Sequence, residues 1–284
     1  MFYFSAIKPT RMDRKAIADI IVDRLEETKE ATKAQFQGSK NQIGYFFIDD
    51  LLPVELADQI HQAFPDNKDM VLKKSIREYK HVAAQMDKYN PILEEAIYAF
   101  QDPRVVQKVH EITGIEGLEP DENLYAGGIS AMAEGNFLNP HLDNSHDKDR
   151  NKWRVLNLLF YVTPNWQDAN GGHLELWPGG VKKPQITLHS RFNRLAVMAT
   201  HHGSWHSVSP VEFAGTRQCV SNYYFSDTPL REEDSFHVTS FRGRPDQKVR
   251  DFVLQLDAKA RMAVRKVFKK GVRENPHVYK KKDS

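Results

Sequence analysis

The feature that most limits the fold of this chain is a change of sequence pattern after Pro120. From there the chain consists of short apolar or alternating runs separated by Gly, Pro, Asn and Asp: NLYAGGISAMA, RVLNLLFYVT, GHLELW, RLAVMAT, SWHSVSPVEF and RQCVSNYYF. Runs of this length between turn residues are typical of antiparallel strands in a sandwich or barrel. We therefore predict a mainly β core over residues 120–230, with helices on either side of it in the sequence.

Helical periodicity marks the region before this core. Apolar residues at three-to-four spacing predict an amphipathic helix over residues 12–33 and shorter helices over 52–64, 90–100 and 103–115. Between the first two, the run IGYFFIDDLL predicts a short buried strand. The polar segment DMVLKKSIREYKHVAAQMDKYN lies between two helices and is a candidate lid. We expect residues 1–119 to pack on the core.

A last amphipathic helix is expected over residues 247–268, and we expect it to dock on the protein through its apolar stripe. The stripe consists of Val249, Phe252, Val253, Leu256, Ala260, Ala263, Val264 and Val267. Residues 231–284 would then form this helix and a basic tail, of which the last dozen residues are expected to fray. A chain of 284 residues exceeds the usual size of one domain, but β-rich folds often reach ~250 residues as one unit. We expect one structural domain overall.

The composition argues against a nucleic-acid binder or a membrane protein. The chain holds 40 Lys and Arg residues against 38 Asp and Glu residues, so it has no overall basic excess to attract phosphate. Residues 242–284 hold 14 of these basic residues and 5 of the acidic ones. Such a cluster is usually a solvated helix face, and contact with nucleic acid or an anionic membrane is the less favoured alternative.

The cellular compartment is predicted from the cysteine content and from the apolar runs. Cys219 is the lone cysteine, which gives no disulfide framework and favours the cytoplasm. No apolar run approaches the ~18 residues of a membrane span, and the N-terminal residues turn polar too early for a signal peptide.

The stretch NPHLDNSHDKDR, residues 139–150, places His141 two residues before Asp143. In a strand, side chains at this spacing project from the same face, so an imidazole nitrogen and a carboxylate oxygen can meet at one point. A second histidine would complete a facial triad, which leaves coordination positions of Fe(II) open for a co-substrate and O₂. The pair alone is weak evidence, because such pairs arise by chance.

The stretch SWHSVSPVEFAGTRQCVSNYYF adds the missing histidine and an arginine. A Pro and a Gly between His206 and Arg217 suit a turn that joins two strands. Arg217 begins an apolar strand, where a guanidinium requires an anionic partner. The partner is either the distal carboxylate of a dicarboxylate, held bidentately by the planar guanidinium, or a buried acid of the protein. Strand parity places Cys219, Ser221 and Tyr223 on the same face as Arg217.

Taken together, these motifs resemble the Fe(II)/2-oxoglutarate-dependent dioxygenases of the prolyl 4-hydroxylase-like branch. The resemblance covers roughly residues 120–227 and is closest to the hypoxia-sensing prolyl hydroxylases. It rests on HLDN, FYVTPNW, GGHLELWPGG and RLAVMATHHGSWHSVSP, followed by TRQCVSNYYF. The fold that it implies is a double-stranded β-helix, the jelly roll of cupin-like proteins, with flanking helices.

The resemblance also implies a set of functional residues. His141, Asp143 and His206 would bind Fe(II), Arg217 would bind the C5 carboxylate of 2-oxoglutarate, and Tyr161 would hydrogen-bond that carboxylate. Two further residues are expected to reach the site from the faces of the same strands, namely Asn157 and Ser221. The sequence departs from the family at Met132, which lies near the position where many members have a tyrosine that binds the co-substrate.

The activity implied is hydroxylation of an unactivated C–H bond with release of succinate and CO₂. Besides Fe(II), 2-oxoglutarate and O₂, ascorbate is a candidate stimulant. The substrate would be a small molecule or a peptide, a prolyl residue included, and nothing in the sequence decides between them.

Several alternatives remain open at this point. His201 or His202, in the turn THHGSW, is a weaker candidate for the third ligand, and His146 is expected to be solvated or to line the entrance. Cys219 is expected to be a buried apolar side chain rather than a reactive thiol. The chain could be a non-catalytic binding module on the same fold. It could also be a metal-dependent hydrolase, for which Glu175 or Glu134 would have to act as general base.

Overall fold

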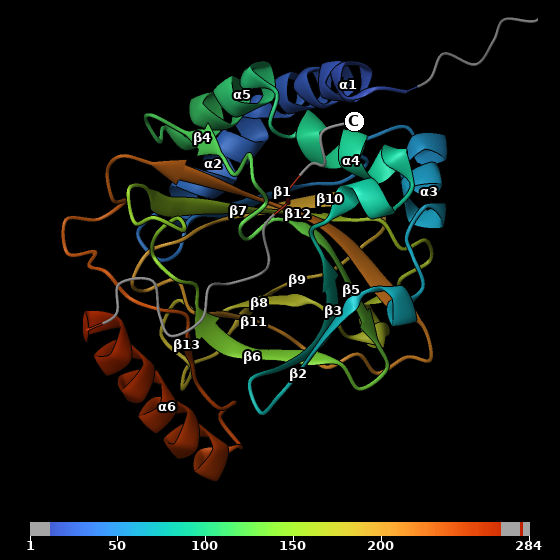
Figure 1. The fold of residues 1–284 in the computed structure, drawn as a ribbon. Helices are drawn as coiled ribbons and strands as arrows, with labels where there is room; N and C mark the ends of the chain where they lie inside the picture. Colours follow the sequence, from blue (N-terminus) through green and yellow to red (C-terminus); the bar gives the residue numbers. More distant parts are fainter. Residues whose placement is uncertain (1–11, 268–278, 281–284) are drawn as a thin grey trace, which may run out of the picture.

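A computed structural model describes residues 12–267 and 279–280 of the chain. Within these residues, thirteen strands form one curled antiparallel sheet, and ten of them follow the order β1-β10-β7-β12-β5-β3-β6-β11-β8-β9. Of the other three, β13 pairs with β6, β2 pairs with β3, and β4 pairs with β12. Helices α1–α5 lie together over one layer of the curled sheet, and α6 lies apart from them near the other layer (Figure 1). The predicted fold class, a mainly β jelly roll with flanking helices, is confirmed.

The strands of the sheet come from the whole length of the described chain. Their bounds are β1 Tyr45–Ile48, β2 Val71–Lys74, β3 Glu78–Ala83, β4 Glu119–Pro120, β5 Gly128–Ala133, β6 Phe137–Leu142, β7 Trp153–Tyr161, β8 Leu174–Leu176, β9 Ile186–Leu188, β10 Arg194–Ala199, β11 His206–Val208, β12 Thr216–Ser226 and β13 Ser240–Phe241. The six strands predicted after Pro120 correspond to β5, β7, β8, β10, β11 and β12.

Local capping explains where three of the flanking helices begin. The helices are α1 Arg14–Glu27, α2 Lys29–Ser39, α3 Val54–Gln62, α4 Pro91–Ala99 and α5 Pro103–Thr113, with α6 Lys248–Val267 after the sheet. Asp13, Asn90 and Asp102 cap α1, α4 and α5 by accepting hydrogen bonds from backbone N–H groups of the first turn. The helix predicted over residues 12–33 is interrupted at Thr28, so it forms two helices.

The candidate lid is part of the sheet rather than a loop. Residues 69–90 form the hairpin β2–β3 and a short 3-10 turn, and β3 pairs with both β5 and β6. The strand pattern was missed because polar residues occupy both faces of this hairpin, so the apolar alternation that marks a half-buried strand is absent.

Strand alternation separates the main core from an inner cavity. On β7, Leu156, Leu158 and Phe160 pack into the main core with helices α1–α5. Asn157, Leu159 and Tyr161 alternate with them, point the other way and line a cavity between the two layers of the sheet. This period of two is what delivers polar side chains of an otherwise apolar strand to one interior space.

Helix α6 forms where it was predicted, but it docks through the opposite face. The apolar stripe faces solvent: Val249 and Phe252 are 81% and 63% exposed, and Val253, Leu256 and Val264 are also exposed. Ala260 and Ala263 are exposed as well, while the Val267 side chain lies outside what the structure describes.

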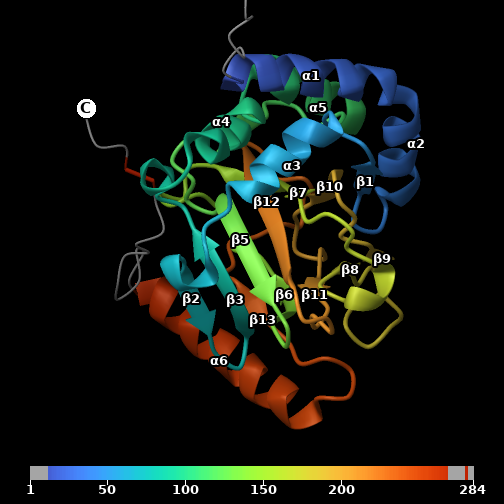
Figure 2. The same cartoon turned by 90° about the vertical axis from the view of Figure 1, so that its right-hand side faces the viewer.

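Ion pairs and one buried apolar side chain orient α6. Nε of Arg242 lies 2.6 Å from Oδ1 of Asp251 and donates a hydrogen bond to it. Asp257 pairs with Arg77, which lies in the turn of the β2–β3 hairpin. Leu254 is the buried apolar residue of the docked face. Figure 2 shows α6 running below the β2–β3 hairpin.

The end of the chain was expected to fray, and most of it lies outside the described residues. Tyr279 contradicts that expectation, because it is buried in the main core and its hydroxyl donates to Glu94 at 2.8 Å. None of the helices in the described ranges is both long and apolar enough to span a bilayer.

The docked face of α6 predicts a contrast between two alanine substitutions. Leu254→Ala should lower the free energy of unfolding by about 2 kcal/mol or more, because it removes a fully buried side chain. Phe252 lies two residues earlier on α6 and is mostly exposed, so Phe252→Ala should change the free energy of unfolding by less than about 0.5 kcal/mol. Urea denaturation of both variants measures the two values. A larger loss for Phe252→Ala would instead mean that the helix docks through its apolar stripe.

Candidate active site

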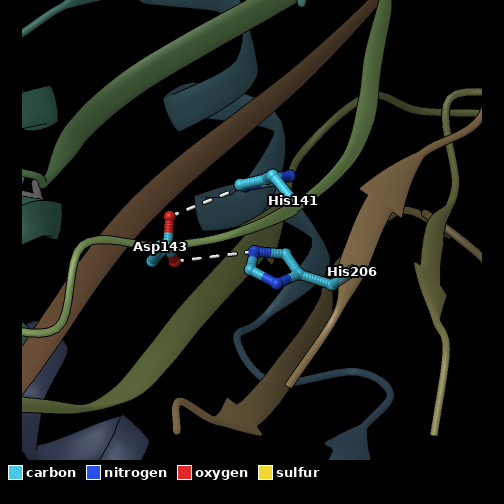
Figure 3. A group of neighbouring side chains, drawn as sticks. All are labelled: His141, Asp143 and His206. Carbon is cyan, nitrogen blue, oxygen red and sulfur yellow. Dashed lines mark ion pairs between the residues drawn. The ribbon is translucent and has the colours of Figure 1, made fainter. Parts of the chain in front are cut away.

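Three side chains from two paired strands converge in the inner cavity. His141 is near the end of β6, Asp143 follows that strand directly, and His206 begins β11. His206 lies directly opposite His141 in the β11–β6 pairing. The Asp143 carboxylate lies 3.6 Å from Nε2 of His141 and 3.5 Å from Nε2 of His206. Figure 3 shows the two imidazoles and the carboxylate turned toward one another.

Hydrogen bonds to the backbone fix the orientation of both imidazoles. Nδ1 of His141 lies 3.0 Å from the carbonyl oxygen of Asn139, and Nδ1 of His206 lies 2.9 Å from that of Ser204. A neutral imidazole that donates from Nδ1 keeps a lone pair on Nε2. Both lone pairs therefore face the Asp143 carboxylate, which is the arrangement in which histidines bind a metal.

The electrostatics of the site favour the protonation states that metal binding needs. Burial opposes ionisation of Asp143, but the neighbouring His206, His141 and Arg154 outweigh it and hold the pKa of the carboxyl well below its usual range. Burial, and then the nearby His141, lower the pKa of His206 to about 4. Two histidines and one carboxylate are the ligand set of non-haem Fe(II) oxygenases, so these residues fit this metal.

Asp143 is also held by two neighbours on β7. Nδ2 of Asn157 donates a hydrogen bond to Oδ2 of Asp143 at 2.8 Å, and Nη1 of Arg154 lies 3.5 Å from Oδ1. The Arg154 guanidinium is stacked over the ring of Tyr223, 4.5 Å from its centroid. The sequence indicated Asn157 as a co-substrate contact, whereas Arg154 was missed because an arginine near a strand end gives no signal of its partner.

Arg217 lines the same cavity as the three converging residues and is 4% exposed. Nη2 donates to the sulfur of Met132 at 2.9 Å, and Nε is buried without a hydrogen-bond partner among the described residues. A buried guanidinium N–H that lacks an acceptor is costly, and an anion in the cavity would relieve that cost. The buried protein carboxylate that was the alternative partner is not found in the described part of the chain.

Several neighbours shape the space around Arg217. The guanidinium lies over the ring of Tyr161, 5.3 Å from the centroid, and burial raises the pKa of the Tyr161 hydroxyl, which stays a neutral donor. Gly172 has φ +69°, and a Cβ there would lie 3.1 Å from Cδ of Arg217. Glycine at this position therefore permits both the turn and the close approach of the arginine.

The remaining residues predicted on this face also line the cavity, whose volume is about 120 Å³. Cys219, Ser221 and Tyr223 share the face of Arg217 on β12, as strand parity predicted. Cys219 is buried and unpaired. Met132 lies directly opposite Arg217 in the β12–β5 pairing.

The other histidines near the triad form separate groups. His201 and His202 cluster with Asp234, and Nδ1 of His202 lies 2.8 Å from that carboxylate. Both ring nitrogens of His201 are engaged, with the backbone N–H of Gly203 and the carbonyl of Ile43. Neither histidine joins His141 and Asp143. His146 lines the outer entrance.

Comparisons with known proteins agree with this geometry. Residues 127–225, which include the three converging residues and Arg217, match the family described as 2OG-Fe(II) oxygenase superfamily. None of the curated protein sequences matches this chain.

Solved structures share the fold at low sequence identity. A prolyl 4-hydroxylase from Phytophthora capsici has a TM-score of 0.54 at 15% identity, over 95% of this chain and 85% of that one. A prolyl-4-hydroxylase from Pseudomonas putida has a TM-score of 0.51 at 16% identity, over 69% and 98%. A prolyl hydroxylase from Trichoplax adhaerens has a TM-score of 0.50 at 17% identity, over 71% and 92%. At these identities the likeness shows a common fold.

The converging ligands predict the response of Fe(II) binding to substitution. His141→Ala, Asp143→Ala and His206→Ala should each abolish stoichiometric Fe(II) binding, because a site with two ligands loses affinity and geometry. His202→Ala is the matched control, since His202 belongs to the other cluster and should leave binding unchanged. Anaerobic equilibrium dialysis measures the stoichiometry. Full binding by any of the first three variants would refute the ligand set.

The buried histidines predict how stability depends on pH. The pKa of His201 and that of His206 are each lowered by burial to about 4, below the value of about 6.5 in an unfolded chain. The unfolded state therefore binds protons that the folded state excludes. The stabilisation is complete above about pH 6.5 and is lost as the pH falls toward about 4.

The slope of this loss has a measurable size. Each such histidine should contribute up to about 1.4 kcal/mol per pH unit across this window. Urea denaturation of the metal-free protein at a series of pH values gives the total slope. His201→Gln should reduce this slope by up to about 1.4 kcal/mol per pH unit, the contribution of one histidine. An unchanged slope would show that His201 is protonated in the folded state.

Proposed function

This chain belongs to the 2OG-Fe(II) oxygenase superfamily, and on that premise we propose that it hydroxylates an unactivated C–H bond of a small-molecule or peptidyl substrate while 2-oxoglutarate is converted to succinate and CO₂. One observation carries the proposal. A single cavity is lined both by the three converging ligands and by a buried arginine with an unpartnered N–H group. A metal and a dicarboxylate can therefore be bound side by side.

The proposed roles divide the cavity into a metal side and a co-substrate side. His141, Asp143 and His206 bind Fe(II) through Nε2, a carboxylate oxygen and Nε2. Arg217 binds the C5 carboxylate of 2-oxoglutarate by a charge-assisted pair, which is among the stronger hydrogen-bonding arrangements in proteins. Tyr161, which lies beneath the guanidinium, donates a hydrogen bond to the same carboxylate.

The remaining residues position these groups. Iron with 2-oxoglutarate and O₂ supplies the oxidising power, and the protein supplies binding, orientation and a shaped cavity. Asn157 and Arg154 hold the Asp143 carboxylate from the β7 side, so that its oxygens keep a fixed direction when the ion binds. We therefore assign Asn157 a positioning role and Ser221 a place in the co-substrate wall. Ascorbate, which would return oxidised iron to Fe(II), is a candidate stimulant.

The rival functions have less support. Neither Glu175 nor Glu134 lines the cavity of the three ligands. Glu175 accepts a hydrogen bond from Ser207 and pairs with Arg244, and Glu134 is exposed in the turn between β5 and β6. The two candidate general bases of a hydrolase are therefore engaged or exposed away from the three ligands. A binding module without turnover would not explain why a facial triad, which leaves coordination positions open, lies beside an arginine with an unpartnered N–H group.

Prolyl hydroxylases among the structural neighbours support a peptidyl prolyl substrate as one candidate. A small molecule is an equal candidate, since a fold at this level of identity hosts many substrates. The unpaired Cys219 is compatible with the cytoplasmic location expected from the sequence.

The co-substrate role of Arg217 predicts a specific kinetic change. Arg217→Lys retains the charge without the planar fork, and Arg217→Ala removes both. Hydrogen bonds to charged groups contribute about 1.5 to 3 kcal/mol, so the alanine variant should raise the KM for 2-oxoglutarate at least about tenfold. Fe(II) binding should persist in both variants because Arg217 is not a ligand.

The measurement is succinate formation as a function of 2-oxoglutarate concentration, with Fe(II) binding followed in parallel. An unchanged KM in a variant that still binds iron would mean that the co-substrate is anchored elsewhere. Loss of iron binding in Arg217→Lys would likewise contradict the division of roles.

A further inference from the structure

A second, larger cavity borders the candidate active site and opens outward. Its volume is about 900 Å³, within the usual range of roughly 300 to 1,000 Å³ for ligand pockets. His141 and Asp143 line both this outer cleft and the inner cavity, and so does Lys80. A molecule in the outer cleft therefore lies beside the metal ligands.

The side chains that line the outer cleft carry an excess of positive charge. The cations are Lys73, Arg77, Lys80, Arg154 and Arg261, against the carboxylates of Glu78, Asp143 and Asp147. Asp143 belongs to the proposed metal site, where a divalent ion would more than offset its charge.

Two of these cations face each other across the β2–β3 hairpin. Lys73 and Lys80 are directly opposite in the antiparallel register, an arrangement of like charges that destabilises a strand pair. Glu78 pairs with Lys80 at 3.1 Å. The Lys73 side chain makes no hydrogen bond or ion pair with the residues that the structure describes, so the one carboxylate of Glu78 faces two lysine charges.

The guanidinium groups of the cleft are also incompletely matched. Arg77 and Arg261 share one carboxylate, that of Asp257 on α6. Nη2 of Arg261 is buried and lacks a hydrogen-bond partner within residues 12–267 and 279–280. A buried N–H group without an acceptor, like the opposed lysines, is unfavourable until an anion binds.

The other walls of the cleft are apolar. They are formed by Leu138, Phe236, Val238, Phe241, Ala260 and Val264. The last two belong to α6, whose apolar stripe is exposed, and Phe241 stacks on the ring of His141 at 5.2 Å between centroids. An apolar surface therefore leads from the outer end of the cleft to the metal ligands.

From these observations we propose that the substrate is an amphiphilic anion, with a carboxylate or phosphate ester that binds between Lys73 and Lys80 and an apolar body along the α6 wall. This inference names the substrate class of the proposed oxygenase and rests on that function. The anionic group lies at the hairpin, and the apolar part is presented to the metal centre for oxidation.

Binding of matched probes tests the proposal on the protein loaded with Fe(II) and saturating 2-oxoglutarate without oxygen. The probes are octanoate and octyl phosphate, each compared with a neutral partner, octanamide and octanol. Isothermal titration calorimetry should give at least about tenfold tighter binding for an anion than for its partner, which is about 1.4 kcal/mol. The two anions distinguish a carboxylate site from a phosphate site.

Variants of the hairpin locate the preference. The double variant Lys73→Met, Lys80→Met replaces both lysines by unbranched side chains without charge. It should lose the preference for anionic over neutral probes. Lys74→Met is the matched control, because Lys74 lies next to Lys73 on β2, does not line the cleft and covers the ring of Tyr79 at 4.5 Å. It should retain the preference.

The outcomes separate this inference from the proposed function. Equal affinity for anionic and neutral probes, no binding of any probe, or a preference that survives in the double variant would each overturn the substrate class. Failure to bind Fe(II) and 2-oxoglutarate before any probe is added would instead overturn the oxygenase itself. Lys73→Met alone serves if the double variant does not fold, and it should weaken anion binding without changing that of the neutral partners.

Discussion

The pairing of β11 with β6 is the contact on which the site depends. It places His206 directly opposite His141, although the two residues are far apart in the sequence. Asp143 follows β6 at once, so one strand pairing brings all three candidate ligands together. The curled sheet then brings a second layer, with Asn157, Tyr161 and Arg217, over the same space. The cavity is therefore a product of strand register, and a shift of one residue would turn these side chains to the opposite face.

The sequence predicted the elements whose pattern is local. Alternating apolar runs identified most strands of the jelly roll, and the His-x-Asp pair with the later His and Arg identified the residues that meet in the cavity. The cap residues Asn90 and Asp102, each followed by a proline, mark the starts of α4 and α5. These features depend on neighbours in the chain, which a sequence displays directly.

Features that depend on distant partners could not be predicted in this way. The β2–β3 hairpin has polar residues on both faces because it lines a cleft instead of a core. Helix α6 has a clear apolar stripe, yet the pairs of Asp251 with Arg242 and Asp257 with Arg77 turn the stripe outward. Arg154 was overlooked for the same reason, since its importance lies in its contact with Asp143.

The central claim is that the three ligands and Arg217 form one site for a metal and its co-substrate. A crystal structure of the protein with Mn(II), as a stand-in for Fe(II), and 2-oxoglutarate tests it most directly. The account predicts one ion bound by Nε2 of His141, Nε2 of His206 and the carboxylate of Asp143, with the C5 carboxylate of 2-oxoglutarate paired to Arg217. An ion bound at the His201, His202 and Asp234 cluster instead, or 2-oxoglutarate bound away from Arg217, would contradict it.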